Sequence, residues 1–225
     1  MAFAVGGAGP TWDLPDHDVV RHASRYGRGQ LGRAQAAAAT LSLLALPGCP
    51  YRYQGEELGR EQSDVPEQVR QDPIWLRSGE LGRDSCRTPI PWEAEPPGRG
   101  FTSGTPCLLL AADAATRAVD AQGPGSVLEL YRSALALRKD LRRHLPQRLC
   151  WEAAPDGALA YSRELDGGGR PLCALATGSD VELQVGAGSL LLTSRPGARC
   201  QHGVLHLPVD TAAWVRLDPP SPDRP

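Results

Sequence analysis

Asp16, His17 and Asp18 are the adjacent side chains best suited to chemistry in this sequence. An imidazole flanked by two carboxylates supplies hydrogen-bond acceptors and a group that can exchange a proton near neutral pH. The same residue types are also typical of an Asp-rich turn or of a helix N-cap. Taken alone, the triplet leaves both interpretations open. A metal site is not expected, because no second group of His or Cys lies at ligand spacing.

Two later segments also carry clustered polar side chains. Glu56 and Glu57 are adjacent carboxylates that follow Gly55, and by themselves they predict ordinary surface solvation. The segment 82–92, GRDSCRTPIPW, contains Arg87 among other charged residues. It is suited either to line a groove or to form an ion-pair network inside a long loop. Neither segment identifies a reaction by itself.

The elements that must position these groups begin with a predicted strand–helix–strand unit. Residues 11–14 are expected to form a short strand before Pro15, and residues 50–54 a second one. Between them, the run 30–46 has Leu and Ala at alternating spacings of three and four, which predicts a helix. Such a unit indicates a parallel sheet. Asp18 and Glu56 would then follow the carboxyl ends of neighbouring strands, where the catalytic residues of parallel barrels gather.

Residues 55–125 contain no long periodic segment. A loop of this length inside a compact domain is usually functional. A second helix is predicted from Ser126 to Arg143, because Ser126 and Glu129 form a capping box and basic residues follow at its carboxyl end.

The chain after Pro146 changes to short apolar segments separated by Gly-rich turns. Six or seven strands at about ten-residue spacing predict an antiparallel β-sandwich. The predicted fold class is therefore α/β followed by all-β. Both ends of the chain, including residues 219–225, are expected to be disordered.

Composition excludes several classes of function. The 24 basic and 26 acidic side chains nearly balance, which argues against nucleic-acid and membrane partners. The sequence has no long apolar run and no recognisable signal peptide, so a cytoplasmic protein is expected. Six cysteines occur singly, with no Cys-x-x-Cys pair: Cys49, Cys86, Cys107, Cys150, Cys173 and Cys200. We expect them to be reduced thiols, and we expect no cofactor.

Four motifs in order resemble a known family. WDLPDHDVVRHASRYG, LPGCPYRYQGEELG, VRQDPIW and GRDSCRTPIPW, spread over about residues 11–101, resemble the carboxyl-terminal third of glycoside hydrolase family 13, the alpha-amylase family. Within that family they are most similar to alpha-glucosidases of the oligo-1,6-glucosidase and trehalose synthase type. The resemblance implies that residues 1–147 are the last two βα units, strands seven and eight, of a (β/α)8 barrel. Residues 55–125 would be its active-site loop, and residues 148–218 would be the β-sandwich called domain C.

The resemblance also implies roles for individual residues. Asp18 matches the family aspartate that grips ring hydroxyls of the glucose at the cleavage site, and His17 matches a histidine that binds the same sugar. Arg21 occupies a position near the site, Glu56 ends strand eight, and Arg87 lies over the substrate mouth. The implied partner is an alpha-linked glucose oligosaccharide or disaccharide, and no metal is implied.

The sequence departs from the family pattern beside the aspartate. Asp16 replaces the usual Asn, and Pro15 replaces a small polar residue. An added carboxylate next to Asp18 is expected to keep one of the two protonated and to change how the sugar is held.

No Gly-x-Arg-x-Asp nucleophile motif with a following Glu occurs in the 225 residues. Retaining glycosidases need two carboxyl groups roughly 5 Å apart, and a barrel takes roughly 250 residues. We therefore expect the carboxyl-terminal portion of a longer enzyme, inactive alone, with the rest of the barrel supplied elsewhere. Two alternatives remain open, namely a non-catalytic saccharide-binding or interaction subunit and a trehalose synthase-type isomerase.

Overall fold

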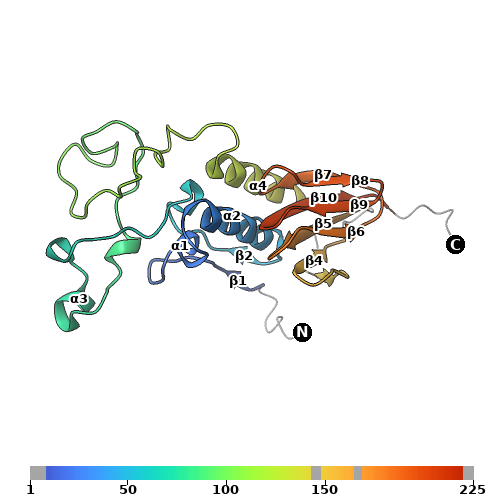
Figure 1. Ribbon diagram of the computed structural model, residues 1–225, viewed down its shortest axis with the longest axis horizontal. Coiled ribbons are helices and arrows are strands. Elements are labelled where there is room, and N and C mark those ends of the chain that lie inside the picture. The colour runs from blue at the N-terminus through green and yellow to red at the C-terminus, as the bar shows by residue number, and fades with distance from the viewer. Residues whose placement is uncertain (1–8, 143–147, 165–168, 220–225) are drawn as a thin grey trace. The chain divides into compact units, whose positions relative to one another are not determined.

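The computed structural model describes residues 9–142, 148–164 and 169–219 (Figure 1). It contains two compact units, the first drawn from residues 1–12, 37–50 and 132–225 and the second from 13–36 and 51–131. The predictions for Arg143 and for nearly all of the two chain ends lie outside the described residues.

The predicted strand–helix–strand unit is confirmed. β1 (Thr11–Trp12) pairs in parallel with β2 (Cys49–Pro50), and α2 (Gly29–Ala45) lies between them in the sequence. The indole of Trp12 donates a hydrogen bond of 2.6 Å to the carbonyl of Pro47. This bond ties the first strand to the turn that precedes the second.

Both strands are shorter than the sequence predicts. Residues 11–14 and 50–54 were expected, whereas each strand contains two residues. The second paired position of β2 is Pro50, which has no N–H to donate, and Pro15 follows the first segment. The ladder therefore stops where proline removes a donor.

The second long helix, α4, spans Val127–Arg142. The hydroxyl of Ser126 accepts the N–H of Glu129 at 3.2 Å, and the Glu129 carboxylate accepts the N–H of Gly125 at 2.6 Å. The predicted cap is confirmed, with its return bond placed one residue earlier than in a standard capping box.

The carboxyl-terminal half of the first unit contains two antiparallel sheets (Figure 1). One has the strand order β3-β4-β5-β10-β7, and the other has the order β6-β9-β8. The strands are β3 (Cys150–Trp151), β4 (Ala158–Ser162), β5 (Arg170–Ala176), β6 (Val181–Gln184), β7 (Gly188–Thr193), β8 (Arg199–Gln201), β9 (Val204–Leu207) and β10 (Thr211–Leu217).

Apolar side chains from both sheets form one core, which includes Leu172, Leu183, Leu205 and Val215. In β6 buried residues alternate with exposed ones, as expected for a strand with one buried face, whereas six of the seven residues of β10 are buried. The described residues of this region form eight strands, one more than the upper number predicted, because β8 is a three-residue edge strand that is mostly exposed. Such a strand has no apolar run to reveal it.

The five-stranded sheet also buries its opposite face. The indole of Trp214 on β10 donates a hydrogen bond of 3.0 Å to the carbonyl of Leu41 in α2, and the hydroxyl of Tyr161 on β4 donates to the carbonyl of Ser42. Large aromatic side chains thus pack against the helix while their polar ends are satisfied.

Arg138 of α4 satisfies the carboxyl end of α2. Its guanidinium donates to the carbonyl of Leu46 at 2.8 Å and to that of Gly48 at 2.7 Å. The last carbonyls of a helix have no partner within the helix, and a cationic donor also opposes the helix dipole favourably.

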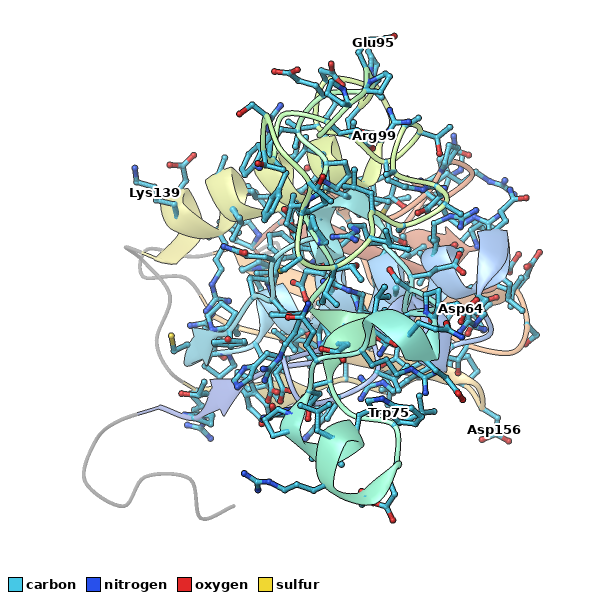
Figure 2. All side chains as sticks on the ribbon, turned by 90° about the vertical axis from the view of Figure 1, so that its left-hand side faces the viewer. Asp64, Trp75, Glu95, Arg99, Lys139 and Asp156 are labelled. Carbon is cyan, nitrogen blue, oxygen red and sulfur yellow. The ribbon has the colours of Figure 1, made fainter. Side chains whose placement is uncertain are left out.

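The second unit is built mostly of loops (Figure 1). Its regular elements after β2 are short: α3 (Pro73–Ser78) and the 3-10 helices Glu56–Leu58, Glu67–Val69 and Asp84–Cys86. Figure 2 shows Trp75 on α3, where the guanidinium of Arg70 lies 4.4 Å from the ring centre. In the described part of the chain, no helix has the length and apolar character needed to cross a membrane.

Candidate functional site

Asp16 shapes the loop that carries His17 and Asp18. Its Oδ1 atom accepts the backbone N–H of Asp18 at 2.7 Å and that of Val19 at 3.1 Å. A side chain that caps its own backbone in this way forms a tight turn. The turn interpretation and the site interpretation are therefore compatible, because Asp16 makes the turn that presents Asp18.

Three positively charged or polar groups converge on one oxygen of Asp18. Its Oδ1 atom lies 2.8 Å from Nη1 of Arg83, 3.2 Å from Nη2 of Arg87 and 3.5 Å from Nε2 of His17. The Asp18 side chain is 50% exposed. Its Oδ2 atom accepts no hydrogen bond from any residue that the structure describes. One carboxylate oxygen is thus held by two arginines, and the other has no hydrogen-bond donor among the described residues.

These contacts keep Asp18 ionised. The hydrogen bond from Arg83 is the main reason that the pKa of Asp18 is lowered, and the charges of His17, Arg83 and Arg87 act in the same direction. Desolvation opposes them without prevailing. The sequence predicted that one carboxyl of the Asp16–Asp18 pair would stay protonated, whereas the pKa of Asp18 is shifted in the opposite direction because Arg83 donates to it.

The loop 82–92 is fastened to the backbone of His17. The carbonyl of His17 accepts a hydrogen bond of 3.2 Å from Nε of Arg87 and one of 3.1 Å from the thiol of Cys86. Arg87 therefore grips both the carboxylate of Asp18 and the backbone beside it. The structure brings His17, Asp18 and Arg87 together, although about seventy residues separate them in sequence.

Arg21 lies in the interior, with 2% of its surface exposed. Its guanidinium donates to the carbonyl of Gln54 at 2.9 Å and to that of Cys86 at 2.8 Å, and it lies 4.7 Å from the ring centre of Tyr53. Burial lowers the pKa of Arg21. The residue joins three segments of the second unit. Its hydrogen bond to the Cys86 carbonyl supports the loop that contacts Asp18.

Glu56 is also buried, with 2% of its surface exposed. It follows Gly55, whose positive φ of 87° makes the turn after β2. Burial raises the pKa of Glu56 to about 7, while Arg52, whose Nη1 lies 3.4 Å from Oε1, and Tyr131 act in the opposite direction. In the described residues, no hydrogen bond or ion pair joins Glu56 to Asp18.

The sequence did not single out Asp72, and it suggested Arg83 only as part of a groove or an ion-pair network. Arg83 donates to both Asp18 and Asp72. The available signal was the Asp72–Pro73 pair, which is typical of a helix start. Nothing in that local pattern shows that the capping carboxylate also holds an arginine of the site.

The surroundings of Asp18 offer space for a ligand. A hollow of about 490 Å³ opens beside it and is also lined by Val20, Arg28, Arg83 and Cys86. Among the described residues, no three His, Cys, Asp or Glu side chains are close enough to hold a metal ion. A half-exposed carboxylate beside a polar hollow can accept hydrogen bonds from hydroxyl groups.

Comparisons with known proteins agree on one family. The alpha-amylase catalytic domain model matches residues 6–145. A probable alpha-glucosidase of Rhizobium meliloti (strain 1021) is 42% identical over 133 residues, which are 57% of this chain and 24% of that protein. An oligo-1,6-glucosidase of Heyndrickxia coagulans is 32% identical over 147 residues, covering 55% of this chain and 26% of that protein.

A solved structure gives the same result for the fold. The alpha-glucosyl transfer enzyme XgtA matches with a TM-score of 0.75 and 34% identity, over 92% of this chain and 40% of XgtA. The chain spans about a quarter of the length of the curated relatives named above. The matched region contains the loop of Asp18 and both arginines that hold it.

Proposed function

Because the chain belongs to the alpha-amylase family, we propose that it forms the sugar-gripping part of an alpha-glucosidase-type glycoside hydrolase. The substrate class is an alpha-linked glucose disaccharide or oligosaccharide, and the reaction is cleavage of the glucosidic bond with retention. The names of the relatives, alpha-glucosidase and oligo-1,6-glucosidase, support this class of substrate.

The single observation that carries the proposal is the state of Asp18. Its Oδ1 is held by Arg83 and Arg87, while the side chain is half exposed and ionised. Its Oδ2 is then oriented to accept hydrogen bonds from two neighbouring ring hydroxyls. Hydrogen bonds of this kind strengthen as the sugar approaches the oxocarbenium-like transition state, and they supply several kcal/mol in glycosidases.

His17 and Arg87 complete the proposed contact set. The His17 ring is about half exposed and can bind the same sugar, and Arg87 lies at the rim with a partly exposed guanidinium. Arg21 and Glu56 stay predictions as binding residues, because each is buried and has the contacts described above. For Arg21, support of the loop that carries Cys86 is the role best supported by its hydrogen bonds.

We further propose that the nucleophile and the general acid/base come from outside these 225 residues, because the sequence contains no motif for them. In this proposal, residues 1–147 contribute strands seven and eight of a barrel with the loop 55–125 at its mouth. Residues 148–218 form domain C. The strand–helix–strand unit and the two-sheet sandwich support this assignment.

The proposal is tested by titrating the 225-residue chain with isomaltose and maltose in a calorimeter. We expect measurable binding that weakens at least tenfold in Asp18→Ala, equivalent to about 1.4 kcal/mol. Asp64→Ala is the matched control, because Asp64 is an exposed carboxylate that lines the same hollow, and among the described residues it has one ion pair, to Arg28 at 3.9 Å. Circular dichroism verifies that each variant is folded.

Two outcomes would contradict the proposal. Binding that survives both Asp18→Ala and His17→Ala would favour a non-catalytic saccharide-binding subunit. Hydrolysis of a chromogenic alpha-glucoside by the chain alone would show that its own residues supply the missing carboxyl groups.

A further inference from the structure

We infer that Arg83 and Asp72 are positioning residues that fix the orientation of the Asp18 carboxylate. This inference rests on the proposed function, since Asp18 is the residue proposed to bind the sugar. Neither residue needs to touch the ligand. The argument depends on how the two are held in the described structure.

Arg83 is clamped at two points along its length. Its backbone N–H donates to Oδ2 of Asp72 at 2.9 Å, and its Nε donates to the same oxygen at 3.2 Å. Its Nη1 then reaches Oδ1 of Asp18 at 2.8 Å. An arginine fixed at both backbone and guanidinium loses most of the rotamer freedom that a surface arginine keeps, so it presents its donors in one direction.

Asp72 is itself immobilised. Its Oδ1 accepts the N–H of Ile74 at 2.8 Å and so caps α3, and its own N–H donates to Oδ2 of Asp84 at 2.9 Å. Its side chain is almost fully buried. A buried carboxylate with several donors is a rigid support, and the pKa of Asp72 is lowered first of all by the N–H of Ile74.

Gly82 provides an independent observation on the same support. A Cβ atom added at Gly82 would lie 2.5 Å from both Cβ and Cγ of Asp72. The backbone at this point passes directly against the side chain of Asp72. Any larger residue at position 82 would push Asp72 away and with it the clamp on Arg83.

Arg87 also bonds to Asp18, but it has a different second anchor. Its Nε holds the His17 carbonyl in the loop of Asp18 itself. Arg87 therefore joins the segment 82–92 to the Asp18 loop at two points. Arg83 alone of the two also bonds to Asp72, so the Asp72–Arg83 pair connects the Asp18 carboxylate to the residue that caps α3.

The test measures the titration of Asp18 in the full chain by carboxyl-carbon NMR. The charged groups facing Asp18 are Arg83, Arg87 and His17, so only changes among them or their supports are expected to move its pKa. We expect Arg83→Gln to raise the pKa of Asp18. Asp72→Asn leaves all three facing groups in place but also removes a carboxylate, which by itself would lower the pKa of Asp18, so a rise in this variant would report the loss of the clamp on Arg83.

The control is Arg77→Gln, an exposed arginine on α3, which should leave the Asp18 titration unchanged. A purely structural role for Asp72 would lower thermal stability without moving that titration. An unchanged pKa of Asp18 in folded Gly82→Ala, which disturbs Asp72 without changing any charge, would overturn the inference.

A second pair of variants covers the case in which Asp72→Asn does not fold. Gly82→Ala should raise the Asp18 pKa although it changes no charge. In Arg83→Lys the pKa of Asp18 should return only part of the way from its value in Arg83→Gln toward that of the parent. One ammonium group cannot bond to both carboxylates in the geometry of a guanidinium. Full rescue by lysine together with an unaffected Gly82→Ala would show that charge alone is sufficient, and the inference would be wrong.

The titration needs no sugar, so it separates this inference from the proposed function. If the variants shift the pKa of Asp18 while the chain binds no isomaltose, the positioning pair stands and the proposed function fails. If isomaltose binds through Asp18 while the titration stays unchanged, the opposite holds.

Discussion

The β-sandwich and the loops around Asp18 are stabilised in different ways. The sandwich has a continuous apolar core drawn from two sheets, with Leu205 fully buried at its centre. The loops of the second unit instead depend on charged and polar side chains. Arg21 and Arg60 are among the largest fully buried side chains of the described chain, and each donates hydrogen bonds to backbone carbonyls.

This difference matters for function. A core of aliphatic residues tolerates volume-conserving substitutions, and its strands are held by burial together with their backbone ladders. A network of arginines and carboxylates fixes directions, because each bond requires a given donor and acceptor geometry. Loops without regular structure can present Asp18 in one orientation only if such a network replaces the missing backbone ladder.

The largest effect is expected in the sandwich. Leu205→Ala removes a fully buried side chain and leaves a cavity, so the free energy of unfolding should fall by about 3 to 4 kcal/mol. Urea denaturation measures it. Leu159→Ala is the control, since Leu159 is 52% exposed and should cost well under half as much. Similar losses for both would show that the core does not govern this region.

The loop region should instead respond to pH through Glu56. Its pKa is raised to about 7 from 4.5, so the unfolded chain loses this proton first, and stability declines as the pH rises from about 4.5 to 7. Glu56→Gln should remove that decline and be more stable than the parent at pH 8, by about 2 to 3 kcal/mol.

The comparison is made by urea denaturation at pH 5 and pH 8. Glu95→Gln serves as control, because Glu95 is exposed on the long loop (Figure 2). This substitution should leave the change of unfolding free energy with pH as it is in the parent. The prediction would be contradicted if the free energy of unfolding changed by the same amount between pH 5 and pH 8 in the parent and in Glu56→Gln.

The smallest of these effects is expected for a buried arginine. Arg21→Met leaves the carbonyls of Gln54 and Cys86 without their donor. The free energy of unfolding should fall by about 1 to 2 kcal/mol, because the lost hydrogen bonds are partly offset by no longer burying a charge. Urea denaturation followed by tryptophan fluorescence measures the loss, with Arg77→Met as control. A variant as stable as the parent would show that these hydrogen bonds orient the loops without adding to the free energy of unfolding.

Regular elements were predictable to within a residue or two where periodicity is strong. The helix expected at 30–46 is found at Gly29–Ala45, and the capped helix begins at Val127. The strand at Arg199–Gln201 was missed, because a short exposed edge strand has no apolar alternation. Periodicity reports burial, so elements that bury little are invisible to it.

The site was predictable only in part. The sequence singled out the loop of Asp18 and the segment 82–92, and the structure brings these two segments into contact. The contact between Arg83 and Asp72 was beyond any local pattern, and so was the burial of Arg21 and Glu56. Each depends on segments that meet only after folding.

The sequence by itself determined the family and the order of the two long helices and most strands, and it singled out Asp18 as the proposed sugar-binding residue, because these follow from motifs and from local periodicity. Only the tertiary structure decided which oxygen of Asp18 the arginines hold. That choice depends on guanidinium groups 65 and 69 residues away, and their directions are set by packing that no neighbouring residue encodes.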